Sequence, residues 1–177
     1  MCPHKIVILR YGHRPNRDKR ASTHLALVAR AFGAHEIWFD TRDEKIEEKI
    51  CQVNRTFGGN FVVKTGVDWR RALNEAKSMN FCIVHLTMYG IPLPQVIEEL
   101  RRKEALLVLV GGPKVPKVFY EVADYNVSIT NQPHSEVAAI AVFLDWLYGG
   151  REFNLKIEGG KLEIIPSERG KSVRVIR

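Results

Sequence analysis

The chain of 177 residues is 45% hydrophobic and carries a formal net charge of +7, so it can bury one sizeable core and favours an acidic partner such as nucleic acid. No apolar run approaches membrane-spanning length, and a strand pattern starts within the first residues, so we expect a cytosolic protein without a membrane anchor or signal peptide. Cys2, Cys51 and Cys82 are far apart, and the six histidines form no HxH or HExxH spacing, which predicts reduced thiols and no metal site.

Strand-like and helix-like segments alternate through the first half of the chain. A β-branched run at 6–9 precedes an amphipathic helix that Ser22 or Thr23 can cap and that ends at Gly33. A strand at 36–39 follows, and then a helix that Asp43 can cap and that Gly58 ends. The next predicted strands are 61–64 and 81–86, separated by a helix near 69–77.

The same alternation continues to residue 150. Strands are predicted at 106–110 and 126–129, and helices at 95–102 and 116–122. A last, apolar helix follows the polar stretch "TNQPHSE", where His134 or Ser135 can cap it and Glu136 lies in its first turn. The pattern predicts an α/β fold over residues 1–150, with a mostly parallel sheet and helices on both faces.

Residues 151–177 follow a different pattern. The stretch "FNLKIEGGKLEIIP" alternates polar and apolar residues around Gly159 and Gly160, which predicts a β-hairpin turning at these glycines. The tail "SERGKSVRVIR" holds four basic residues and one acid. We therefore expect a C-terminal appendage to the main domain.

Several common nucleotide-binding and hydrolase motifs are missing from the sequence. The first strand is not followed by GxGxxG, and no GxSxG elbow occurs. Gly170, Lys171 and Ser172 resemble the end of a P-loop, but Ile165 stands where its first glycine is required. Conventional dehydrogenase, kinase and hydrolase functions are disfavoured.

A basic cluster separates the first strand from the first helix. The basic side chains between positions 10 and 20 outnumber the single acid, Asp18; they are Arg10, Arg14, Arg17, Lys19 and Arg20. Such a cluster can be a solvated loop, or its guanidinium groups can converge on phosphates.

Three late loops follow predicted strands and carry Gly, Pro or polar residues: "VHLTMYGIPLP", "LVLVGGPKVPKVFY" and "ITNQPHSEVAAIAVFLD". Gly111 and Gly112 permit close backbone approach. Each loop alone is an ordinary α/β connection, but loops at the carboxyl ends of parallel strands are where open α/β folds bind ligands.

Together with "LRYGHRPNRDKRASTHLALVARAFGA" and "IPSERGK", these loops closely resemble the archaeal tRNA cytidine 2'-O-methyltransferases of the SPOUT superfamily, over nearly the whole chain. The resemblance implies an enzyme that uses S-adenosyl-L-methionine to methylate the ribose of the T-loop cytidine at position 56 of tRNA. It also implies a C-terminal trefoil knot and a homodimer, and the apolar helix from Val137 to Leu147 agrees with a covered surface.

The resemblance further implies residue roles. The expected cofactor contacts are Leu86, Gly111, Gly112, Pro113, Lys114, Val115, Ile129, Thr130, Asn131, Gln132, Pro133, His134, Ser135 and Glu136. The tRNA contacts are predicted from the basic cluster and the basic tail and are Arg10, Arg14, Arg17, Lys19, Arg169, Lys171 and Arg174. Arg20 is the expected catalytic arginine, with Asp18 orienting it, although Asp18 can instead form a purely structural ion pair. His24 is a weaker candidate for a base.

Two other functions stay open from the residues alone. A non-catalytic RNA-binding module would use the same basic surfaces without a cofactor. An enzyme acting on another nucleotide-like ligand would use the same loops without tRNA.

Overall fold

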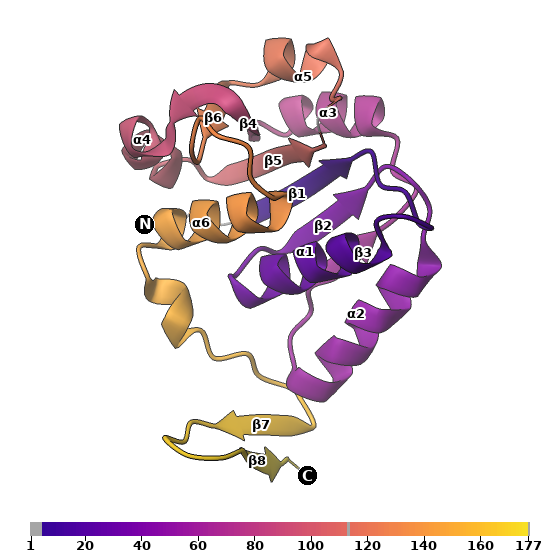
Figure 1. Ribbon diagram of the computed structural model, residues 1–177, viewed down its shortest axis with the longest axis vertical. Helices are drawn as coiled ribbons and strands as arrows, with labels where there is room; N and C mark the ends of the chain where they lie inside the picture. Colours follow the sequence, from indigo (N-terminus) through magenta and orange to yellow (C-terminus); the bar gives the residue numbers. More distant parts are fainter. Residues whose placement is uncertain (1–4, 113, 177) are drawn as a thin grey trace.

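A six-stranded sheet forms the centre of the computed structural model, which describes residues 5–112 and 114–176 (Figure 1). All pairings in this sheet are parallel, and the strand order is β3-β2-β1-β5-β4-β6. The strands are β1 (Lys5–Tyr11), β2 (Glu36–Phe39), β3 (Val62–Lys64), β4 (Cys82–Pro92), β5 (Ala105–Gly111) and β6 (Tyr125–Ser128). The predicted α/β class with a mostly parallel sheet is confirmed.

Helices cover both faces of the sheet. One face carries α1 (Lys19–Ala31), α2 (Glu44–Phe57), α4 (Ile97–Arg101) and α6 (Glu136–Tyr148). The other carries α3 (Trp69–Ser78) and α5 (Lys117–Val122). Two short 3-10 helices, η1 (Leu93–Gln95) and η2 (Arg151–Asn154), complete the helical segments that the structure describes.

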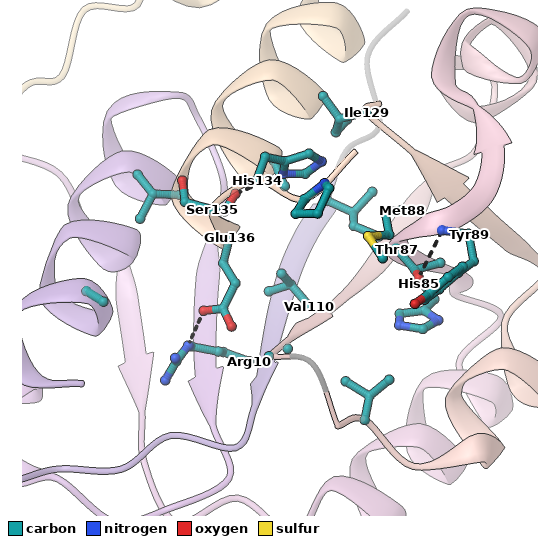
Figure 2. Close-up of a pocket in the computed structure, with 18 of the residues that line it drawn as sticks. Arg10, His85, Thr87, Met88, Tyr89, Val110, Ile129, His134, Ser135 and Glu136 are labelled. Carbon is teal, nitrogen blue, oxygen red and sulfur yellow. Dashed lines mark hydrogen bonds and ion pairs between the residues drawn. The ribbon is translucent and has the colours of Figure 1, made fainter. Parts of the chain in front are cut away.

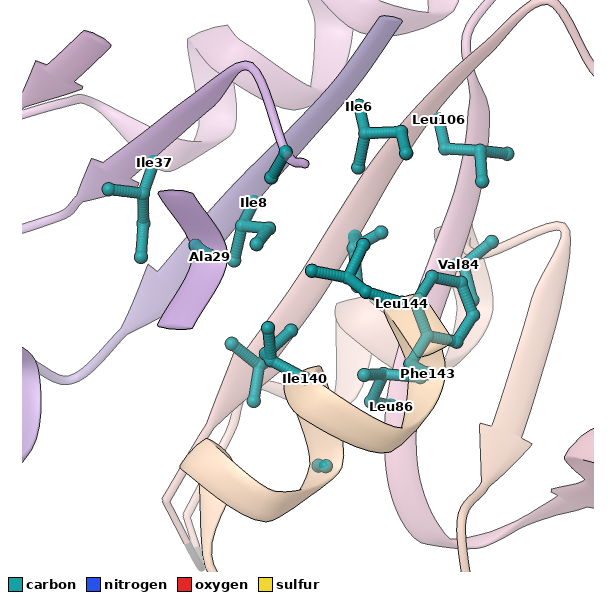
Figure 3. Packing of buried hydrophobic residues seen from close by; sticks show 14 of the residues in the cluster. Ile6, Ile8, Ala29, Ile37, Val84, Leu86, Leu106, Ile140, Phe143 and Leu144 are labelled. Carbon is teal, nitrogen blue, oxygen red and sulfur yellow. The ribbon is translucent and has the colours of Figure 1, made fainter. Parts of the chain in front are cut away.

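Alternation along β1 supplies both hydrophobic layers. Ile6 and Ile8 pack beneath α1 and α6, whereas Val7 and Leu9 point to the opposite side, because successive strand residues face opposite sides of a sheet (Figure 3). Both pairs are fully buried, and so are Phe143 and Leu144 of α6. The first strand is thus held from both faces, which fixes the positions of the residues at its carboxyl end.

Helix α6 has well-formed ends. Ser135 lies at the N-cap, and its Oγ accepts a hydrogen bond of 3.1 Å from the backbone N–H of Ala138, which confirms Ser135 as one of the two predicted caps. The helix ends at Gly149, whose φ of 62° is in the left-handed region that glycine adopts without strain. The loop before α6 is therefore joined to a rigid helix.

The caps predicted for α1 and α2 are wrong. Helix α1 begins at Lys19, so Ser22 and Thr23 lie buried inside its first turns and cannot cap it. Asp43 does occupy the N-cap position of α2, but its side chain makes no capping hydrogen bond. Gly58 ends α2 with a φ of 86°, as predicted.

The C-terminal hairpin exists but lies further along the chain than predicted. Its strands are β7 (Leu162–Ile165) and β8 (Ser172–Val175), which pair antiparallel. Of the two glycines expected to form the turn, Gly160 instead packs this segment on the end of α2: a Cβ on it would lie 2.6 Å from the backbone nitrogen of Gly58. The backbone N–H of Gly59 also donates to the carbonyl of Glu158 at 2.8 Å.

The strand order reverses direction at β1. From β1 the chain builds outward through β2 and β3, whereas β5, β4 and β6 lie on the other side. In open parallel sheets the crevice at the carboxyl ends beside such a reversal is the usual ligand site. Among the described residues, no helix is long and apolar enough to cross a membrane.

Candidate functional site

A cavity of about 610 Å³ opens at the carboxyl ends of β1, β4 and β5 and beneath the start of α6 (Figure 2). This volume lies in the range that holds a drug-sized ligand or a cofactor. The three late loops of the sequence meet here. Their members on the cavity wall that were expected at a cofactor site are Leu86, Gly111, Gly112, Val115, Ile129, Pro133, His134, Ser135 and Glu136.

Other expected cofactor residues lie elsewhere. Lys114, Thr130 and Gln132 are exposed and are not among the wall residues, and Pro113 lies outside the described residues. Asn131 is also off the wall, but its Nδ2 donates to the carbonyl oxygen of Met88 at 2.7 Å. Asn131 therefore ties the loop before α6 to the loop in β4, so it supports the cavity from outside.

The β4 loop bulges toward the cavity. Leu86 and Ile91 are both in register with Val127 of β6, so residues 87–90 are extra in the ladder. A Cβ on Gly90 would lie 2.5 Å from the backbone of Val127, so only glycine permits this close crossing. The bulge places Thr87, Met88 and Tyr89 on the cavity wall, which the sequence did not reveal beyond the run "TMYG" after a strand.

The two glycines after β5 have different environments. A Cβ on Gly111 would lie 2.6 Å from a side-chain carbon of Val115, so this glycine is required by the packing of its own loop. A Cβ on Gly112 would meet only Glu136 Oε1, at 3.8 Å. Gly112 thus leaves open space in the wall, where a side chain would intrude.

Arg10 is the buried cation of the cavity. It is only 5% exposed, and its Nε donates to Glu136 Oε2 at 2.7 Å. Its Nη1 donates to Ser22 Oγ at 2.9 Å. We expected Arg10 at the tRNA surface; instead it shares the strand face of Ile6 and Ile8, and this two-residue periodicity was the available signal that it points under α6.

Asp18 and Arg20 are not paired in the described residues. The Asp18 carboxylate binds the guanidinium of Arg14 at 3.0 Å and lies 3.6 Å from Nη2 of Arg10. The hydrogen bond from Arg14 holds the pKa of Asp18 below its usual value. Residues two apart at a helix start do not face each other, which explains why the expected Asp18–Arg20 contact is wrong.

Arg20 itself is exposed, and its neighbour Ala21, not Arg20, is a wall residue. Arg17 and Lys19 are exposed as well, which suits a surface that binds phosphates. His24 is also exposed on α1 and is not among the wall residues, so its role as a base stays a prediction.

His85 is a wall residue that the sequence analysis missed. It is 1% exposed, and its Nδ1 lies 2.9 Å from Asn126 Oδ1, an acceptor, so Nδ1 carries the hydrogen. Burial lowers the pKa of His85, although the bond to Asn126 opposes this, and the imidazole is neutral near pH 7. A histidine inside a buried strand was the only sequence signal.

The basic residues of the hairpin lie away from this cavity. Arg169 and Lys171 are exposed, and Arg174 pairs with Glu163 on the neighbouring strand through a bond of 2.8 Å. None of them is a wall residue, and the hairpin lies beyond the end of α2 (Figure 1).

The described cysteines, Cys51 and Cys82, are not among the wall residues of the cavity. Burial raises the pKa of the Cys82 thiol to about 11, whereas Cys51 is exposed and Cys2 lies outside the described residues. The described part of the chain contains no group of three or more His, Cys, Asp and Glu residues that could hold a metal ion.

The sequence comparisons all match tRNA 2'-O-methyltransferases. A family model described as tRNA ribose 2'-O-methyltransferase matches residues 57–174. A tRNA (cytidine(56)-2'-O)-methyltransferase of Staphylothermus marinus is 54% identical over 174 residues, which cover 97% of this chain and 94% of that protein. One of the same name from Thermoplasma volcanium is also 54% identical and covers 97% of this chain, which spans only 50% of that longer relative.

Among solved structures, the SpoU methyltransferase AviRb from Streptomyces viridochromogenes, in complex with the cofactor AdoMet, is similar in fold. Its TM-score is 0.59 at 13% identity, and the match covers 85% of this chain and 59% of that one. This likeness concerns the fold alone.

Proposed function

The chain belongs to the family of tRNA ribose 2'-O-methyltransferases, and we propose that it transfers a methyl group from S-adenosyl-L-methionine to the 2'-oxygen of cytidine 56 of tRNA. The observation that carries the proposal is the convergence of all three late loops on one cavity of about 610 Å³. Membership of an enzyme family argues against a non-catalytic RNA-binding module.

The cavity suits the methyl donor. Leu86, Val110, Ile129 and Val137 give it an apolar wall for an adenosine, and the open space at Gly112 leaves room beside the backbone. S-adenosyl-L-methionine supplies a methyl group on a positively charged sulfonium.

Arg10 is the side chain that we propose to act on the ribose. Methyl transfer needs in-line approach of the 2'-oxygen, and holding that oxygen in place supplies much of the rate. The guanidinium is fixed by Glu136 and Ser22, so its remaining N–H groups can hydrogen-bond an oxygen on which negative charge develops.

The catalytic role of Arg20 stays a prediction, but Arg20 would have to act from outside the cavity. Because it is exposed and off the wall of its own chain's cavity, it can reach a reacting nucleotide from outside or from a second copy of the chain. Asp18 then acts on Arg14 and Arg10 instead of Arg20.

The tRNA is proposed to contact two basic surfaces. One is the start of α1 with Arg14, Arg17 and Lys19, and the other is the C-terminal appendage, residues 151–177, with Arg169, Lys171 and Arg174. Exposed cations at separate points can hold phosphates of a folded RNA.

A homodimer and a trefoil knot also remain proposals, as does a cytosolic location. Helix α6 buries Phe143 and Leu144 against the sheet, but Val142 and Trp146 of the same helix are 38% and 41% exposed, which leaves an apolar surface for a second copy. Light scattering should give twice the mass of the 20.2 kDa chain; a mass of one chain at every concentration would refute the dimer.

The activity is tested with a labelled methyl donor and an unmodified tRNA transcript. Label should enter cytidine 56, and no label in any nucleotide would refute the proposed function.

A further inference from the structure

A buried chain of polar side chains leads from the cavity to the start of α2. Arg10 Nη1 donates to Ser22 Oγ at 2.9 Å, Ser22 Oγ lies 2.8 Å from His13 Nδ1, and His13 Nε2 lies 3.0 Å from Asp43 Oδ2. Ser22 and His13 are 0% and 2% exposed, and Asp43 is 9% exposed. Four polar side chains are thus withdrawn from water behind the cavity wall.

The hydrogen bonds of this chain have one consistent direction. A carboxylate only accepts, so His13 Nε2 donates to Asp43, whereas Nδ1 faces Nη1 of Arg10, which only donates, and is therefore an acceptor. The hydroxyl of Ser22 therefore donates to Nδ1, which leaves its oxygen free to accept from Arg10. Arg10 Nη1 also lies 3.3 Å from the same Nδ1, which agrees with an acceptor at that atom. Each member sets the orientation of the next.

Two aspartates at helix N-caps bind other side chains and do not cap their helices. Asp43 and Asp18 occupy the N-cap positions of α2 and α1, yet neither makes a capping hydrogen bond. A capping side chain is typically worth about 1 kcal/mol. Instead, Asp43 binds His13, and Asp18 binds Arg14 and faces Arg10.

Nη2 is the nitrogen of the Arg10 guanidinium that has an ion pair but no short hydrogen bond among the described residues. Nε binds Glu136 and Nη1 binds Ser22, whereas the contact of Nη2 with Asp18, at 3.6 Å, is longer than a hydrogen bond. Among the described residues, Nη2 has no closer acceptor in the structure.

We propose that Asp43, His13 and Ser22 are positioning residues that hold the Arg10 guanidinium so that Nη2 meets the reacting ribose. This inference rests on the proposed function and adds residues that contact neither cofactor nor tRNA. A guanidinium without its Ser22 partner can rotate, and a misplacement of about 1 Å can reduce turnover about 100-fold.

Ser22→Ala and Asp43→Ala each remove one link of the chain formed by Asp43, His13, Ser22 and Arg10, called the relay below, and Thr23→Val is the matched control. Thr23 is the next residue of α1 and is also buried, but its hydroxyl bonds the carbonyl of Lys19 and does not touch Arg10. We expect kcat to fall about 10- to 100-fold in the two relay variants, with KM for tRNA and Kd for S-adenosyl-L-methionine within about twofold of wild type. Thr23→Val should have the kcat of the wild type. Ser22→Thr, which retains the hydroxyl, should have most of the wild-type kcat.

Double variants distinguish positioning from general loosening. If the relay acts through Arg10, Ser22→Ala should cost nothing further in an Arg10→Ala background, because coupled residues are not additive. Losses that multiply in the double variant, or an equal loss in Thr23→Val, would overturn the relay. So would an unchanged kcat in either relay variant; Asp43→Ala gives an independent test if Ser22→Ala does not fold.

Turnover of the wild-type protein on cytidine 56 distinguishes failure of the proposed function from failure of the relay. Absence of wild-type turnover on cytidine 56 would refute the proposed function itself. Wild-type turnover with unaffected relay variants would refute only the relay.

Discussion

Arg10 and Glu136, 126 positions apart in sequence, are joined by a hydrogen bond of 2.7 Å from the guanidinium Nε to the carboxylate. The bond links the carboxyl end of β1 to the first turn of α6, where the helix dipole favours negative charge. It brings Arg10, the first residue of the basic cluster, and the polar stretch before α6 into one site (Figure 2).

Gly112→Val should weaken cofactor binding without unfolding the protein. The added side chain would enter the cavity, where the nearest atom to its Cβ is Glu136 Oε1 at 3.8 Å. We expect Kd for S-adenosyl-L-methionine, measured by calorimetry, to rise at least about tenfold, which is about 1.4 kcal/mol. Unchanged affinity in a folded variant would remove this cavity as the cofactor site. Gly111→Val is less informative, because it also clashes with Val115.

The two candidate arginines should differ in their effects. Arg10→Lys keeps a charge but cannot hold Glu136 and Ser22 in the same planar arrangement, so kcat should fall about 100-fold or more. Arg20→Ala should also lose turnover while cofactor binding survives, if Arg20 reaches the nucleotide from outside. Single-turnover rates with saturating tRNA separate these effects from binding, and normal rates in either variant would exclude that arginine from the chemical step.

Removing basic side chains from the hairpin should weaken tRNA binding and leave the rate of methyl transfer unchanged. Arg169→Ala with Lys171→Ala should lower the slope of log K against log salt by about 0.7–0.9 for each tRNA phosphate that the variant no longer neutralises. Arg174→Ala should lower it less, because Glu163 already pairs with Arg174. Arg71, an exposed residue of α3 that pairs with Glu75, is the control. An unchanged slope in the double variant would exclude the hairpin from the tRNA surface.

Glu36 should contribute stability that disappears in acid. Burial alone would raise its pKa, but hydrogen bonds from Lys5, Trp38 and Lys64 outweigh burial and hold the pKa at about 2, against an ordinary value of 4.5. A lowered folded-state pKa means that the contribution is present above about pH 5 and disappears as the pH falls toward 2. Since Lys5 and Lys64 are about half exposed, we expect only about 1–2 kcal/mol.

The measurement compares wild type with Glu36→Gln by urea unfolding at several pH values. The difference in unfolding free energy should be largest at pH 7 and close to zero near pH 2. A difference independent of pH would mean that the Glu36 charge contributes nothing.

The alternating strands and helices were predictable because periodicity depends on local sequence and burial. The late loops were predictable as a site for the same reason, since parallel strands bring their carboxyl ends to one edge. The role of Gly160 was not predictable, because it depends on contact with the end of α2 about a hundred positions earlier.

Side-chain partners were the least predictable feature. Asp18 and Asp43 both stand where capping residues are expected, and the sequence does not show that Arg14 and His13 compete for them. Arg10 was placed with the surface arginines by charge alone, whereas its strand parity with Ile6 and Ile8 indicates the buried side.

The acceptor atom is the central claim, and two tRNA transcripts that differ only at cytidine 56 test it most directly. One carries ribose at that nucleotide and the other carries 2'-deoxyribose, and both are incubated with enzyme and labelled S-adenosyl-L-methionine. Ribose transcripts should incorporate close to one methyl group per molecule and the deoxy transcripts none, with similar affinity for both. Equal labelling of the two transcripts would show that the 2'-oxygen of this cytidine is not the acceptor.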